Sequence, residues 1–154
     1  MVWPRANYVF TCDWDGILKQ FSLSDFSLYR TFNKVIKKGA RKMCATKNSR
    51  HLFIGDLDGF IKHYTFEEDG DLKHRNFFRD HESAIRAMAL THDDQFLFTA
   101  SHCGQLKQHY IHPAAKCLMK RKDWSDIFVN NSSILCLVIS LDNEYLFMGD
   151  KDGH

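Results

Sequence analysis

The sequence predicts an all-β fold built from repeated antiparallel hairpins. One phrase, an apolar run followed by a turn and a second apolar run, occurs in four copies. The turn glycines of these copies are Gly16, Gly59, Gly104 and Gly153, which lie 43, 45 and 49 residues apart. A period in this range is typical of a repeat architecture and not of a single globular core.

Each copy of the phrase reads as a strand, a tight turn and a second strand. The turns end in Asp15-Gly16, Asp58-Gly59, Cys103-Gly104 and Asp152-Gly153, where glycine accepts a positive φ without strain on a Cβ. The fourth residue of each copy is small, whereas most of its neighbours are apolar and large; these small residues are Cys12, Gly55, Ala100 and Gly149. This pattern predicts a closely packed first strand with both faces buried, which requires sheets stacked on sheets.

Further strands are expected on both sides of the hairpin. Segments 41–48, 86–93 and 135–142 are apolar strands that end in Thr46, Thr91 or Ser140, with Asn or Asp two residues later. This is the chemistry of a turn capped by side chains. Segments 26–32, 73–78 and 116–120 are candidates for an outer strand, so each period contains four strands.

On these motifs the chain resembles the WD-repeat β-propellers, in which a repeat of about 40 to 45 residues forms one four-stranded blade. The resemblance implies a single partial propeller over residues 1–154, with about three to three and a half antiparallel blades and no closed ring. The expected blades span about 1–34, 35–78, 79–122 and 123–154, the first without its own initial strand. We interpret the chain as a fragment of a longer protein, in preference to an incomplete ring, that needs further blades or another chain to close.

The buried His–Ser/Thr–Asp–Trp network of this family is complete in no copy. His81 and Thr99 match its histidine and hydroxyl in the third repeat. The hairpin aspartate is matched by Asp15, Asp58 and Asp152 and is replaced by Cys103 in the third copy. The first two tryptophan positions hold Phe21 and Tyr64, which we expect to be buried, and the third holds His109.

Composition indicates an intracellular protein, either cytoplasmic or nuclear. The chain has 154 residues and is 44% hydrophobic, yet it contains no apolar stretch long enough to span a membrane and no signal peptide at its start. Its five cysteines show no close pairing and are interpreted as reduced packing residues. A formal net charge of +2 does not favour a nucleic-acid partner.

The sequence does not favour a metal or catalytic site. His102, Cys103, His109, His112 and Cys117 together offer zinc ligands or a nucleophile and a base. The repeat alignment distributes them over a turn, a strand and a loop, and no Cys-x-x-Cys pair occurs. We therefore expect no metal, no cofactor and no enzymatic activity.

Two clusters of basic residues define an alternative function. The first comprises Lys34, Lys37, Lys38, Arg41 and Lys42, and the second comprises Lys116, Lys120, Arg121 and Lys122. Such clusters between blades would suit a module that binds the phosphates of RNA, a phospholipid or a phosphoprotein. The interpretation favoured over it is solvated loop charge, offset by Glu67, Glu68, Asp69 and Asp71.

The residue before each hairpin aspartate, or before its substitute, is the candidate for partner contact. These residues are Trp14, Leu57, His102 and Lys151. The resemblance implies that this position lies on the top surface where partners of propellers dock, although Trp14 could instead fold onto its own blade. The expected function is a non-catalytic scaffold for protein–protein interaction.

Overall fold

A computed structural model describes residues 2–3, 8–37, 39–48, 50–67, 71–112, 117–124 and 132–154. Within these residues all regular secondary structure is β-strand, and every strand pair is antiparallel. The predicted all-β class is therefore confirmed.

The strands form three four-stranded sheets and one two-stranded sheet, each in sequential order. The first sheet contains β1 (Val2–Trp3), β2 (Tyr8–Cys12), β3 (Leu18–Ser22) and β4 (Leu28–Phe32). The second contains β5 (Ala40–Ala45), β6 (His51–Asp56), β7 (Phe60–Phe66) and β8 (Leu72–Arg79). The third contains β9 (Ile85–Leu90), β10 (Phe96–Ser101), β11 (Leu106–His112) and β12 (Cys117–Asp123). The fourth contains β13 (Ile134–Ile139) and β14 (Leu146–Asp150).

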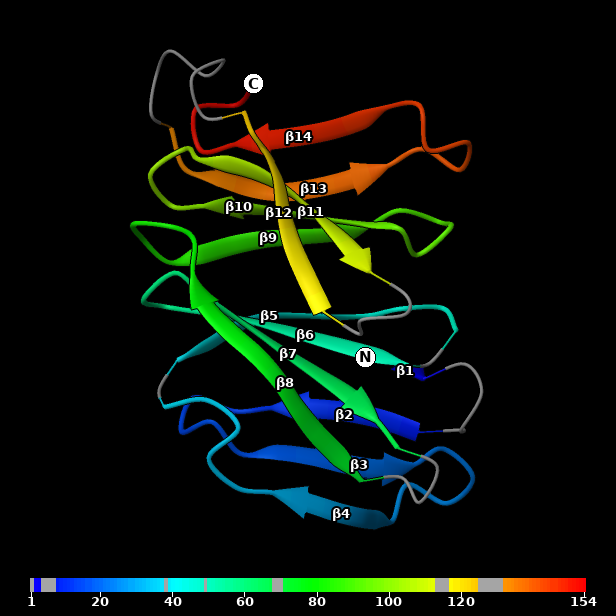
Figure 1. The fold of residues 1–154 in the computed structure, drawn as a ribbon. Coiled ribbons are helices and arrows are strands. Elements are labelled where there is room, and N and C mark those ends of the chain that lie inside the picture. The colour runs from blue at the N-terminus through cyan, green and yellow to red at the C-terminus, as the bar shows by residue number, and fades with distance from the viewer. Residues whose placement is uncertain are drawn as a thin grey trace.

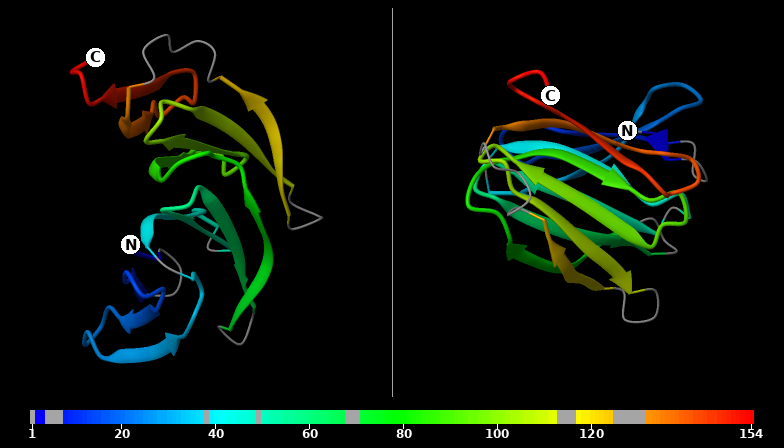
Figure 2. Two further views of the ribbon diagram at one scale, coloured as in Figure 1. Left: turned by 90° about the vertical axis from the view of Figure 1, so that its left-hand side faces the viewer. Right: turned by 90° about the horizontal axis from the view of Figure 1, so that it is seen from above.

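The sheets are stacked face to face in chain order (Figure 1). In the left view of Figure 2 they fan out as an open arc, with β8 and β12 on its outer side and the N- and C-terminal sheets at its two ends. Sequential antiparallel order, with the first strand of each sheet inside and the last outside, is the layout of propeller blades. The described sheets do not close into a ring, as the sequence predicts.

Glycine is required at two hairpin turns by the backbone of the following sheet. Gly16 and Gly59 have φ values of 77° and 83°. A Cβ on Gly16 would lie 2.0 Å from the Ile36 carbonyl oxygen, and one on Gly59 would lie 2.1 Å from that of His81. The Gly59 oxygen in turn accepts a hydrogen bond from the His81 N–H at 3.2 Å. Each turn therefore holds the start of the next blade.

The second strand of the middle blade shows why the fourth residue of the phrase is small. Every residue of β6 is buried. A Cβ on Gly55 would lie 2.7 Å from Cγ2 of Ile85, which belongs to the third sheet. The small residue thus lets neighbouring sheets approach closely, as the sequence pattern predicts.

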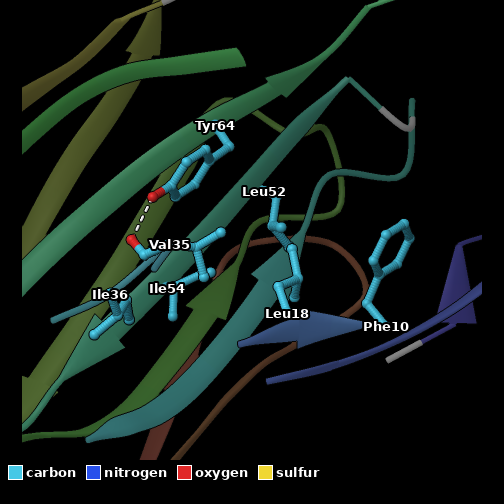
Figure 3. Close-up of a cluster of buried hydrophobic side chains, with 7 residues drawn as sticks. All are labelled: Phe10, Leu18, Val35, Ile36, Leu52, Ile54 and Tyr64. Atoms are coloured by element: carbon cyan, nitrogen blue, oxygen red, sulfur yellow. Dashed lines mark hydrogen bonds between the residues drawn. The ribbon is translucent and has the colours of Figure 1, made fainter. Parts of the chain in front are cut away.

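Three apolar clusters lie between successive sheets. The first, drawn in Figure 3, joins the first and second sheets and contains Phe10, Leu18, Val35, Ile36, Leu52, Ile54 and Tyr64. The second joins the second and third sheets through Phe53, Ile61, Ile85, Leu97, Ile111 and Leu118. The third joins the third sheet to β13 through Ala87, Ala100, Leu106, Ile134 and Leu137. Because each full burial of a large apolar side chain contributes about 1.5–3 kcal/mol, the fold is stabilised blade against blade.

The turns at the opposite end of the sheets are capped by hydroxyl groups. The hydroxyl oxygens of Thr46, Thr91 and Ser140 accept N–H bonds from His51 at 3.0 Å, Phe96 at 2.9 Å and Tyr145 at 2.9 Å, respectively. This confirms the capped turns that the sequence predicts.

A second set of bonds at that end links one blade to the next. The Asp94 carboxylate accepts the N–H groups of Lys47 at 2.8 Å and Asn48 at 3.0 Å, from the preceding sheet. At the equivalent position of the last sheet, Asn143 accepts the N–H of His92 at 2.7 Å. Asp94 and Asn143 have φ values of 60° and 64°, a conformation that Asp and Asn tolerate better than most residues.

Two sequence-based expectations need correction. Tyr64 is buried as predicted, because its ring packs toward the preceding sheet, whereas Phe21 is only half-buried, because no described sheet precedes the first one. The first blade also has a short initial strand, since Val2 and Trp3 pair with Val9 and Tyr8.

Candidate protein-interaction face

The hairpin turns of the sheets form what we call the top face: residues 13–16, 56–59, 101–104 and 150–153, together with the segments that precede β5, β9 and β13. Each of the last three turns is tied to its own blade by one backbone bond. The N–H groups of Leu57, His102 and Lys151 donate to the carbonyls of Gly39, Ala84 and Ser133 at 3.1, 2.9 and 2.9 Å. In each of these bonds the donor follows the acceptor by the same number of residues. The repeat in the sequence is therefore also a repeat in the structure.

The turns are capped by side chains two residues before the expected hairpin aspartates Asp15, Asp58 and Asp152, or before Cys103 in the third turn. Oδ1 of Asp56 accepts N–H bonds from Asp58 at 3.0 Å and Phe60 at 2.8 Å, and Asp13 accepts from Ile17 at 2.8 Å. Asp150 and Ser101 occupy the same position in the last two turns and accept from His154 at 3.0 Å and Gln105 at 3.2 Å.

Asp15, Asp58 and Asp152, the expected network residues, are exposed. The capping role falls on the earlier position because an acceptor must precede the turn to reach its N–H groups. Burial raises the pKa of the Asp56 carboxyl, and the N–H bonds from Phe60 and Asp58 oppose that shift.

Trp14 lies toward the second blade. Its carbonyl accepts the Gly39 N–H at 2.7 Å, and 47% of the residue is exposed. The guanidinium carbon of Arg41, on β5, lies 5.0 Å from the centroid of its ring. The indole therefore contacts a side chain of the second blade, across the blade boundary.

Leu57 completes the same patch. Its side chain covers Gly39 so closely that a Cβ there would lie 2.4 Å from Cδ1 of Leu57. Trp14, Gly39, Arg41 and Leu57 thus form one contiguous surface, which we call the Trp14 patch. Arg41 was assigned from sequence only to a basic cluster, because nothing local signals that β5 brings it over Trp14.

The other two candidates for partner contact lie elsewhere on the top face. His102 is exposed, and its Nδ1 lies 2.9 Å from the Ser133 hydroxyl. Lys151 is exposed in the last turn. Neither is a member of the Trp14 patch.

In the third blade, a buried hydrogen-bond network forms around Thr99. Nε2 of His81 lies 2.7 Å from the Thr99 hydroxyl, which lies 3.0 Å from Nε2 of His109. His109 thus makes the contact expected of the family tryptophan. Burial, followed by the charge of Lys107, lowers the pKa of His81 to about 4 and that of His109 to about 3, so both rings are neutral near pH 7.

In the second blade, the tryptophan position uses a different acceptor. The Tyr64 hydroxyl donates to the carbonyl of Val35 (Figure 3). Nζ of Lys62 donates to the same oxygen at 3.0 Å. In the third blade the equivalent lysine, Lys107, donates to the carbonyl of Asp80. These side chains hold the backbone that leads into each blade.

A buried histidine pair was not anticipated from the sequence. Nδ1 of His51 lies 2.9 Å from Nε2 of His63, whose Nδ1 lies 3.2 Å from the Asn76 side-chain oxygen. Burial, and then the neighbouring His51 ring, lowers the pKa of His63 to about 3. The two residues are twelve apart and meet only because β6 and β7 pair.

The possible zinc or nucleophile residues do not gather at one point. His109 is engaged in the Thr99 network, His102 contacts Ser133, and His112 is the register partner of Cys117. The part of the chain that the structure describes contains no group of three or more His, Cys, Asp or Glu side chains that could hold a metal ion. All five cysteines are free, and burial raises the pKa of Cys12 to about 11.

Two of the acids expected to offset the basic clusters form ion pairs with other arginines. Asp71 pairs with Arg30, and Glu67 pairs with Arg75 at 2.6 Å. In the first cluster Lys34, Lys37, Arg41 and Lys42 are exposed. In the second cluster Lys120 pairs with Asp123 at 3.2 Å, and Nζ of Lys122 lies 3.5 Å from the Trp124 ring centroid. Lys38, Glu68, Asp69 and Lys116 lie outside the described residues.

Stacked four-stranded antiparallel sheets, repeated hairpin turns and apolar clusters between blades define a repeat protein of the β-propeller type. The sequence model of the WD domain, G-beta repeat, matches residues 72–109, from β8 to the Thr99 network. This match and the four-stranded antiparallel sheets are consistent with a WD-repeat family, whose typical role is protein binding. A search of curated proteins found no match. Among the described residues, no helix is long and apolar enough to cross a membrane.

Proposed function

We propose that the chain is a non-catalytic scaffold that binds a protein partner through its top face. The observation that carries the proposal is the Trp14 patch, where a half-exposed indole, a leucine and a guanidinium surround Gly39 at the boundary of two blades. Large apolar and aromatic side chains in exposed turns exceed what the turns need and are typical of interface anchors.

Rigidity of the underlying backbone supports this proposal. Gly39 is bonded to the first hairpin turn through the Trp14 carbonyl and to the second through the Leu57 N–H. An anchor held in place before binding loses little conformational entropy on association. A protein partner would therefore meet a preformed surface.

The test is partner capture with a double variant, Trp14→Ala with Leu57→Ala. Proteins bound by the wild-type chain and identified by mass spectrometry should be lost from this variant while its melting temperature is unchanged. Phe77→Ala is the matched control, because Phe77 is a 58% exposed aromatic residue on the outer strand β8. Retention of every partner by the double variant would contradict the proposal.

A phosphate-binding module is the second candidate, favoured by the exposed basic residues of the two clusters. It is separable by salt, since binding that releases counterions weakens steeply as the salt concentration rises. Charge reversal at Lys37 and Arg121 should then abolish binding, whereas loss of Trp14 should not.

A further inference from the structure

The guanidinium of Arg41 is exposed and unusually well placed for a ligand. Arg41 lies on β5 above the Trp14 ring. No carboxylate of the described residues lies within ion-pair distance of it. A guanidinium stacked on an aromatic face keeps its N–H edge free, and that edge fits a carboxylate or phosphate through two parallel bonds.

The charges around the Trp14 patch favour a single carboxylate over a chain of phosphates. Lys37 and Lys42 are exposed on the basic side of the patch, but Asp15 and Asp58 are exposed in the two turns that flank it. A polyanion lying across the patch would be repelled by both aspartates. One side-chain carboxylate brings a single negative charge to Arg41, while Trp14 and Leu57 offer contact to an apolar neighbour.

We infer that the Trp14 patch binds an acidic peptide segment of the partner, in which an Asp or Glu carboxylate pairs with Arg41 and an adjacent apolar side chain packs on Trp14 and Leu57. This inference rests on the proposed function and specifies its ligand chemistry. The contact with Trp14 positions the guanidinium, which offers a carboxylate two parallel N–H bonds in addition to its charge.

The experiment selects peptides from a random phage-displayed library on the immobilised 154-residue chain. The consensus peptide is then synthesised, together with a version in which Asp and Glu are replaced by Asn and Gln. We expect acidic residues next to apolar ones in the consensus. The amide version should bind at least about tenfold more weakly to the wild type.

Variants of the chain locate the contact. Arg41→Gln should weaken binding of the consensus peptide at least about tenfold. Arg41→Lys should weaken binding less, because lysine keeps the charge but cannot form two parallel N–H bonds to a carboxylate. Arg50→Gln is the matched control, since Arg50 is exposed between β5 and β6, at the opposite end of the same blade, and its loss should change the affinity less than about twofold.

Several outcomes would overturn the inference: an uncharged or basic consensus, no selected peptide, equal affinity for Arg41→Gln, or tighter binding of a phosphoserine peptide or a thymidine oligonucleotide. If the consensus peptide is lost from the Trp14→Ala, Leu57→Ala variant but not from Arg41→Gln, the scaffold function stands and the carboxylate inference fails. If neither variant weakens it, both fail.

Discussion

The Val35 carbonyl accepts hydrogen bonds from two side chains of the second blade, one of which replaces the family's tryptophan. Tyr64 stands where the family has tryptophan, and together with Lys62 it donates to this oxygen at the start of the second blade. The ring is buried in the first apolar cluster, so the same residue supplies packing and a polar contact. The second blade therefore keeps its packing although tyrosine replaces the family's tryptophan at this position.

Tyr64 can be dissected by two substitutions. Tyr64→Phe keeps the ring and should cost about 1 kcal/mol, because Lys62 still satisfies the Val35 carbonyl. Tyr64→Ala removes the ring from the cluster and should cost about 3–5 kcal/mol. Urea denaturation measures both, and equal losses would show that packing of the ring contributes little.

Buried histidines make the fold sensitive to acid. Burial lowers the pKa of His63, His81 and His109 to about 3, 4 and 3, whereas the unfolded value is about 6.5. Between about pH 6.5 and pH 4 the unfolded chain binds protons that the folded chain excludes. Stability should therefore fall as the pH drops through this window, and these groups should have no effect above it.

His109→Gln tests the assignment. The variant should flatten the pH dependence of stability by up to about 1.4 kcal/mol per pH unit, since one proton uptake is removed. Melting temperatures between pH 7 and pH 4 provide the measurement. Parallel curves for the variant and the wild type would mean that His109 titrates normally in the folded chain.

At the scale of elements, the hairpin turns join local conformation to packing between blades. Gly59 and Gly153 share a left-handed conformation, with φ values of 83° and 89°. A Cβ on Gly59 would collide with the His81 backbone, whereas one on Gly153 would meet nothing within 4 Å. A substitution at Gly153 therefore adds backbone strain alone, whereas one at Gly59 adds strain and a steric clash.

Gly59→Ala and Gly153→Ala form a matched pair. Gly153→Ala should cost about 1–2 kcal/mol from backbone strain alone. Gly59→Ala should cost at least about 3 kcal/mol, because the third blade must also move away. Equal thermal shifts would contradict the claim that the turn holds the next blade.

The elements were largely predictable from sequence, because each hairpin and each Thr- or Ser-capped turn depends on residues close together in the chain. The contacts between elements were not. Asp94 binds the turn of another blade, and His51 contacts His63 across a strand pair. Neither contact can be predicted from the spacing of residues in the sequence. Part of the Trp14 patch was predictable, because Trp14 and Leu57 occupy equivalent positions in the repeat. Arg41 was not, because it contacts Trp14 from the next blade.

At the scale of the whole molecule, stability is distributed over three interfaces between sheets, and the last sheet has one uncovered side. Val138 and Phe147 are register partners in that sheet and are each 60% exposed. Within the described residues, β14 pairs only with β13. An apolar face beside an unpaired strand edge is prone to association.

We expect concentration-dependent self-association of the chain through this sheet. Val138→Glu combined with Phe147→Glu should reduce it, whereas Met119→Glu should not, because Met119 is a 51% exposed residue on the outer strand β12. Light scattering over a wide concentration range is the measurement. A wild-type chain that stays monomeric throughout would contradict the expectation.

Hydrogen exchange with the selected consensus peptide tests whether this chain binds protein through its top face. If it does, the bound peptide should slow exchange in segments 13–16, 39–41 and 56–59, around the Trp14 patch. Exchange at the opposite end, in segments 46–48, 91–95 and 140–145, should be unchanged. Protection confined to that end, or to the outer strands β8 and β12, would contradict it.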